Sequence, residues 1–189
     1  MKRNKTLPII VSAAALYFLF VRARTAPATN SNNMGSGMDT SENAAKEALR
    51  KIFNEFGREK TKKLEQLYRK ETAHFKSGQY KGTGSPGMEP SPNSNRAFPY
   101  GWSSLKSFAA QYGIPENSFY IKGPYTEGGT GKQKYFIGFP DVYTAMLFVM
   151  YVIGRRGWNF GKWRAFDETI SSNYNASLNN ITARFTNTF

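Results

Sequence analysis

The sequence lacks cysteine entirely and contains a single histidine among its 189 residues. The missing cysteines exclude disulfide scaffolds, thiolate-bound zinc, iron–sulfur clusters and thiol nucleophiles. One histidine cannot build a multi-histidine metal centre, although carboxylates could still hold Ca²⁺ or Mg²⁺. We expect neither a metal nor a cofactor. Acidic residues are also scarce, because 13 Asp and Glu stand against 26 Lys and Arg, a net charge of +13. This excess predicts an anionic partner: nucleic acid, anionic lipid or an acidic cell-wall polymer.

An uncharged apolar run over residues 7–21 lies near the N-terminus, between Lys5 and Arg22. Its 15 residues are fewer than the about 20 that a spanning helix needs, but the flanking cations can snorkel and extend it. A cleaved signal peptide is the alternative, since small residues follow at 26–28, but the arginines before them disfavour cleavage. We therefore predict a transmembrane helix within an anchor at residues 1–24, which contacts the lipid bilayer through residues 7–21.

Residues 25–41 are small, polar and without periodicity, which predicts a flexible linker. Residues 42–189 hold enough apolar and aromatic side chains for one folded domain. Their patterning predicts an α+β fold that is mainly helical and carries a small β-hairpin. The expected elements are a helical region at 41–75 with a break near Gly57, a long loop at 78–100, a helix at 102–112, strands at 118–125 and 134–139, a buried helix at 142–153 capped by Asp141, and a last helix at 169–185.

One carboxylate interrupts an apolar helical stripe. Glu71 lies four residues after Leu67 and four before Phe75, so a helix places the three on one face. A charged carboxylate is costly to bury, and we expect apolar neighbours to favour the protonated acid. That is the state that a general acid in glycoside hydrolysis needs. The alternative is an ordinary helix-end glutamate, solvated or paired with Lys70 or Arg155.

A second carboxylate would have to come from another part of the chain. Glu127 lies in the expected hairpin turn, where its side chain can overhang a cleft, although an exposed turn residue is the simpler interpretation. Asp141 precedes an apolar helix and is better explained as its N-cap. Glu89 follows Gly87 and Met88 in the long loop and fits either role.

These segments together resemble a known family. Residues 71–77 (ETAHFKS) and 83–89 (TGSPGME) resemble Glu-Ser-Gly-Trp-Gly-x-Ser and Asn-Asn-Leu-Phe-Gly-Ile-Lys in the glucosaminidase branch (glycoside hydrolase family 73) of the lysozyme-like superfamily. Further agreement follows in chain order: residues 125–127 with a Thr-x-Glu in the hairpin, residues 135–139 with a Phe-Arg-x-Tyr segment, and residues 163–181 with a terminal Tyr-Ala-x-Lys helix.

The resemblance implies a lysozyme-like catalytic domain at residues 42–189 in which Glu71 is the catalytic acid and Glu127 the second carboxylate. The Gly-Trp-Gly of the family is replaced by residues 73–75 (AHF). Which glycosidic bond is cut stays open between a glucosaminidase, a muramidase and a lytic transglycosylase. The expected partner is the peptidoglycan glycan strand, and no specific nucleic acid is expected.

Aromatic side chains suit sugar rings because they present a flat apolar face with a polar edge. Core packing is the alternative for each of them. From this argument and the resemblance we expect substrate contacts from Ser77, Tyr80, Met88, Tyr100, Trp102, Tyr125 and Tyr174.

The sequence thus predicts a membrane-anchored peptidoglycan hydrolase whose catalytic domain faces the cell wall, or lies on the membrane of a phage virion. The alternative is a non-catalytic basic protein that binds nucleic acid or glycan, for example a structural component of such a virion.

Overall fold

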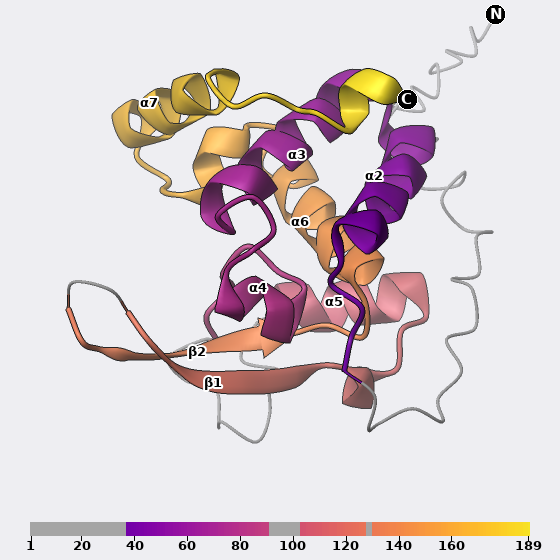
Figure 1. Cartoon of the computed structure of the whole chain (residues 1–189), viewed down its shortest axis with the longest axis vertical. Helices are drawn as coiled ribbons and strands as arrows, with labels where there is room; N and C mark the ends of the chain where they lie inside the picture. Colours follow the sequence, from indigo (N-terminus) through magenta and orange to yellow (C-terminus); the bar gives the residue numbers. More distant parts are fainter. Residues whose placement is uncertain (1–36, 91–102, 128–129) are drawn as a thin grey trace, which may run out of the picture.

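The computed structural model describes residues 37–90, 103–127 and 130–189. These residues form a mainly helical fold with one two-stranded antiparallel sheet (Figure 1), which confirms the predicted α+β class. The predicted anchor at residues 1–24 lies outside the described residues, as does most of the predicted linker. In the part that is described, no helix is both long enough and apolar enough to cross a membrane.

The helices and strands follow one another as α2 (Glu42–Phe56), α3 (Arg58–Glu71), α4 (Gly78–Thr83), α5 (Ser103–Tyr112), the short 3-10 helix η2 (Glu116–Ser118), β1 (Tyr120–Thr126), β2 (Gln133–Gly138), α6 (Val142–Gly154), η3 (Phe160–Trp163), α7 (Glu168–Asn179) and η4 (Thr186–Thr188).

Helix α6 is the centre of the core, as its uniformly apolar sequence predicts. Every residue from Thr144 to Met150 is buried, and α2, α3, α5 and η3 all pack against the helix. The carboxylate of Asp141 accepts a hydrogen bond from the backbone N–H of Thr144 at 2.7 Å, which confirms the predicted N-cap. A helix that is apolar on all sides is stable only when other elements cover all of them.

Helices α2 and α3 confirm the predicted helical pair. Ser41 caps α2 by accepting a hydrogen bond from the N–H of Ala44 at 3.1 Å. Gly57 separates the two helices with a φ of +80°, a backbone conformation that glycine adopts without steric cost. The second helix ends earlier than predicted, at Glu71 rather than near Phe75.

Two further boundaries were predicted wrongly. The expected loop at 78–100 begins with α4, because the Ser77 hydroxyl accepts a hydrogen bond from the N–H of Tyr80 at 3.1 Å and starts a helix. The expected last helix at 169–185 ends at Asn179. Beyond it, the chain turns so that its backbone N–H groups meet the buried carboxylate of Glu65 on α3.

The hairpin lies along α4. Strands β1 and β2 pair antiparallel, with Tyr120 opposite Gly138, and the Tyr120 hydroxyl donates to the carbonyl of Gly82 on α4 at 3.0 Å. The N–H of Ile137 donates to the carbonyl of Met88 at 2.7 Å. In Figure 1 the end of α3, helix α4 and the hairpin follow one another down the molecule, and α7 crosses above them.

Candidate functional site

Glu71 is the last residue of α3. Leu67 and Tyr68, one turn earlier, are fully buried, whereas Glu71 is half-buried. The hydroxyl of Tyr174 on α7 donates a hydrogen bond to Oε1 of Glu71, across 103 residues of sequence. The predicted substrate-contact residue Tyr174 therefore lies directly beside the predicted acid.

Tyr174 holds its proton firmly. Burial is the largest cause that raises the pKa of this phenol well above its usual range, and the hydrogen bond to Glu71 raises it further. Arg164 acts in the opposite direction. The ammonium of Lys70 lies 5.4 Å from the centroid of the Tyr174 ring. Tyr174 therefore keeps its proton near neutral pH and can donate it to the hydrogen bond with Glu71.

The rest of the Glu71 carboxylate is available. Within the described ranges, the bond from Tyr174 is its only hydrogen bond, and no cation lies within ion-pair distance. Neither of the two partners considered from the sequence engages it: Arg155 donates to the hydroxyl of Tyr151 at 2.9 Å, and Lys70 lies over the Tyr174 ring. A carboxylate offers about four lone-pair sites, so Glu71 retains capacity for a ligand. Its protonated state stays a prediction.

The turn after Glu71 has an unusual backbone. Ala73, His74 and Phe75 have φ angles of 48°, 59° and 68°, in the left-handed region. Each costs roughly 1–2 kcal/mol for a residue with a side chain. Such conformations persist where the surroundings over-determine them, and they cluster at functional sites.

Thr72 and Phe75 hold this turn in place. The Thr72 hydroxyl donates to the carbonyl of Tyr68 and accepts from the N–H of Phe75 at 2.9 Å. The ring of Phe75 is buried and stacks on Tyr68, with 6.1 Å between centroids. His74 and Ala73 remain exposed. The turn therefore fixes the backbone that leaves Glu71 and displays His74 beside it.

The other expected substrate contacts are dispersed. Tyr80 is fully buried and packs edge-on against Tyr68 and Phe75, so it is a core residue rather than a sugar platform. Ser77 is occupied as the N-cap of α4. Tyr125 is half-buried, and its hydroxyl fills the space where a Cβ of residue 82 would lie. Tyr100 and Trp102 lie outside the described residues.

Glu127 is exposed in the hairpin turn, and its hydrogen bonds stay within that turn. The Thr130 hydroxyl donates to its Oε2 at 2.6 Å. This hydrogen bond is the main cause that lowers the pKa of Glu127, and Lys134 and Lys132 lower it further. Glu127 is therefore suited to remain ionised. Of the other carboxylates considered, Glu89 pairs with Lys134 at 2.8 Å, and Asp141 caps α6.

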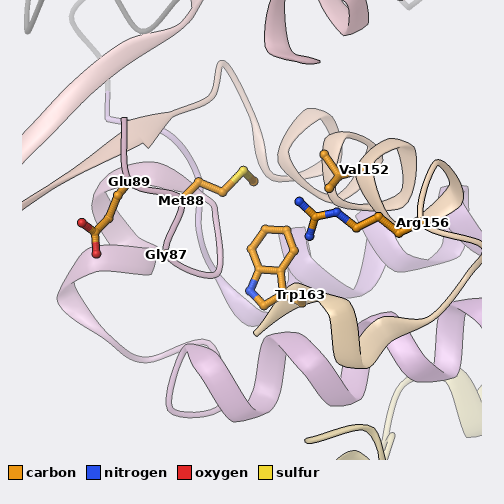
Figure 2. A pocket seen from close by; sticks show the side chains of 6 residues that line it. All are labelled: Gly87, Met88, Glu89, Val152, Arg156 and Trp163. Atoms are coloured by element: carbon orange, nitrogen blue, oxygen red, sulfur yellow. The ribbon is translucent and has the colours of Figure 1, made fainter. Parts of the chain in front are cut away.

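A pocket of about 240 Å³ opens between the loop that follows α4, the end of α6 and η3. Figure 2 shows the indole of Trp163 and the guanidinium of Arg156 at the pocket, with the carboxylate of Glu89 directed away from both. Gly87, Val152 and the predicted contact residue Met88 complete the lining. Since η3 packs against both α3 and α7, the pocket adjoins the elements that carry Glu71 and Tyr174. From the sequence, Arg156 belongs to a basic cluster with Arg155 that would fit a nucleic-acid partner, and Trp163 is expected in the core; neither is predicted to line a pocket.

Arg69 on α3 is buried in an ion pair. It is 4% exposed and pairs with the fully buried Glu65, with 2.7 Å between Nε and Oε1. Its guanidinium lies 5.2 Å from the centroid of the Phe75 ring and 4.6 Å from that of Phe185. In the described part of the chain, no three His, Asp or Glu side chains gather closely enough to hold a metal ion.

No family model, no curated protein and no solved structure matches the chain.

Proposed function

We propose that the protein cleaves the glycan strand of peptidoglycan, with Glu71 as the general acid. The observation that carries this proposal is the pairing of Glu71 with Tyr174. A buried phenol holds one carboxylate oxygen, and the other is left without a partner among the described residues. A general acid needs this arrangement, because it must be held in place and must also reach the substrate.

The turn after Glu71 supports the resemblance to the glucosaminidase branch. That family has glycine at the positions of Ala73 and Phe75, and both residues have left-handed φ angles here. Glycine adopts such angles at no steric cost. Left-handed angles at these two positions support the proposal, although this chain has no glycine there.

In the proposed reaction, the Glu71 carboxyl donates its proton to the glycosidic oxygen. The bond between this oxygen and the anomeric carbon breaks, the leaving sugar keeps the electron pair as a hydroxyl, and positive charge develops on the other sugar ring. Tyr174 stabilises the carboxylate that Glu71 becomes.

Attack on the anomeric carbon completes the reaction. Water assisted by the ionised Glu127 or by the acetamido group of the substrate gives hydrolysis. Attack by a muramic 6-hydroxyl, which passes its proton to the Glu71 carboxylate formed in the first step, gives an anhydro sugar and requires no second carboxylate. We favour assistance by the substrate's own groups over assistance by Glu127, because the hydrogen bonds of Glu127 lie within the hairpin turn.

The charge of the chain fits a polyanionic wall. A net charge of +13 attracts the protein to peptidoglycan and its attached anionic polymers, and salt weakens this attraction. Anchoring through residues 1–24, with the domain facing the wall or on a virion membrane, belongs to the same proposal.

The test is digestion of purified peptidoglycan by the full chain, with mass spectrometry of the products. We expect soluble fragments that end in N-acetylglucosamine, N-acetylmuramic acid or an anhydro sugar, and none with Glu71→Gln. Glu59→Gln is the matched control, because it removes an exposed carboxylate from the first turn of the same helix. Wall fragments released equally by Glu71→Gln would overturn the assignment. Binding to the wall without any product would instead favour the non-catalytic alternative.

A further inference from the structure

The pocket beside η3 contains a cation without a counter-charge. Arg156 is half-buried, and its Nη1 donates to the carbonyl of Lys162 at 2.6 Å. Its guanidinium also lies 4.5 Å from the centroid of the Phe166 ring. Across the described ranges, no carboxylate lies within ion-pair distance of it. Burial lowers the pKa of Arg156, which shows that its charge is partly removed from water.

Glu89, which lines the pocket, and Glu168, which follows η3 in the chain, are already engaged. Glu89 pairs with Lys134 at 2.8 Å, and its carboxylate points away from the pocket (Figure 2). Glu168 pairs with Lys162 at 2.9 Å. A partly desolvated cation that has lost water without gaining an anion costs free energy, and an anionic ligand would supply the missing partner.

The remaining wall of the pocket selects what carries that anion. The Trp163 indole lines the pocket with Arg156 and offers a flat apolar surface, and Met88 and Val152 are apolar as well. Flat apolar rings suit the faces of sugars. A volume of about 240 Å³ is below the roughly 300–1,000 Å³ of sites that enclose a drug-sized ligand. The pocket therefore fits a substituent or a single unit rather than a length of polymer.

We infer that this pocket binds a carboxylate carried on a sugar, namely the lactyl carboxylate of N-acetylmuramic acid or a carboxylate on the peptide attached to it. Arg156 pairs with the carboxylate, and Trp163 lies against the apolar part of the same unit. This inference rests on the proposed function. It identifies the residues that would distinguish N-acetylmuramic acid from N-acetylglucosamine.

The test compares ligands that differ in the carboxylate. N-acetylmuramic acid, muramyl dipeptide and N-acetylglucosamine are titrated into the full chain in detergent, and binding is followed by the NMR shift of the Trp163 indole N–H, assigned with Trp163→Phe. We expect N-acetylmuramic acid to bind at least about tenfold more tightly than N-acetylglucosamine, since charge-assisted hydrogen bonds are among the strong ones. Tighter binding of the dipeptide than of the free acid assigns the peptide carboxylate, and the reverse order assigns the lactyl group.

Arg156→Gln should abolish most of this difference, and Arg156→Lys should retain part of it. Arg155→Gln is the matched control, because it removes the neighbouring but exposed guanidinium, and we expect it to change the affinities less than twofold. Equal affinity of the wild-type chain for the acid and for N-acetylglucosamine would overturn the inference. This comparison needs no variant, so it decides even if Arg156→Gln fails to fold.

The two proposals fail separately. If the protein prefers N-acetylmuramic acid over N-acetylglucosamine but cleaves no peptidoglycan, the proposed activity is refuted and the inferred carboxylate site is retained. Cleavage by an enzyme that binds both sugars equally would refute the pocket alone.

Discussion

Helix α3 carries two glutamates whose surroundings differ sharply. Glu65 is fully buried and accepts four hydrogen bonds: from Nε of Arg69, from the N–H of Phe185, and from the N–H and hydroxyl of Thr186. Glu71, six residues later, is half-buried and accepts one, from Tyr174. Glu65 uses all its lone-pair sites within the protein, whereas Glu71 does not.

The difference shows that burial alone does not identify a catalytic acid. Glu65 is the more deeply buried of the two, yet its hydrogen bonds attach the C-terminal segment to α3, which is a structural task. Glu71 has less burial and fewer bonds, but it adjoins a strained turn and the elements that line a pocket. A carboxylate that is held in place but still has unused hydrogen-bonding capacity is the better candidate for a catalytic acid.

The largest effect expected from this comparison is on activity. Glu71→Gln keeps the shape of the side chain and removes the transferable proton, so we expect peptidoglycan cleavage to fall by about 10²–10⁴-fold. The Tyr174 hydroxyl can still donate to the amide oxygen, and the unfolding free energy should change by less than about 1 kcal/mol. Turnover of purified wall and urea denaturation measure the two quantities. A large loss of stability in this variant would make Glu71 a second structural glutamate.

Glu65→Gln should show the opposite pattern. The substitution leaves the buried Arg69 without its counter-charge, and breaking such a pair costs about 3–5 kcal/mol. We expect a lower urea midpoint and earlier proteolysis of the C-terminal segment, with activity retained in the fraction that stays folded. Unchanged stability would contradict the structural role given to Glu65.

Tyr174→Phe should have an intermediate effect. It removes the single donor to Glu71, and hydrogen bonds to charged groups contribute about 1.5–3 kcal/mol. We expect at least a tenfold fall in kcat with a smaller change in KM, because Tyr174 acts on the carboxylate rather than on the substrate. Tyr80→Phe is the control: its hydroxyl is also buried but bonds to no described residue, and cleavage should continue at the wild-type rate.

The same tyrosine predicts a dependence of stability on alkaline pH. Burial raises the pKa of Tyr174 above its ordinary value of 10.0. Below about pH 10 the phenol is neutral in both the folded and the unfolded chain. Above it, only the unfolded chain releases the proton, so unfolding becomes more favourable as the pH rises. Urea denaturation between about pH 8 and 11 should show this loss, with a shallower slope for Tyr174→Phe. An identical slope in the variant and the wild type would mean that a group other than Tyr174 causes the loss of stability.

The smallest effect concerns the strained turn. Ala73 is exposed with a φ of 48°, so Ala73→Gly should stabilise the protein by up to about 1 kcal/mol, because glycine removes the steric cost. Ala176→Gly, at an exposed position inside α7, should instead destabilise it by roughly 0.5–1 kcal/mol. Equal destabilisation by both variants would show that the turn is not strained.

Local signals in the sequence predicted most of the fold. The cap at Asp141, the break at Gly57 and the apolar run of α6 each depend on residues a few positions apart, and the structure confirms all three. The prediction failed where distant contacts override local pattern. The final helix ends at Asn179 because the backbone beyond it bonds to Glu65 on α3.

The site divides in the same way. The position of Glu71 after an apolar stripe marked it in the sequence, and the family resemblance pointed to Tyr174. No local pattern revealed the buried pair of Arg69 with Glu65, or the pocket that Arg156 shares with Trp163.

The amino-acid order by itself determined the α+β class, the basic surface and the position of one unusual glutamate on its helix. Tertiary structure alone decided which glutamate of α3 is fully bonded and which keeps an oxygen without a partner among the described residues. The physical reason is that helical periodicity and caps act over about four residues. Tyr174, which bonds to Glu71, and Phe185 and Thr186, which bond to Glu65, lie more than 100 residues away along the chain and meet these glutamates only when α3, α7 and the C-terminal segment pack together.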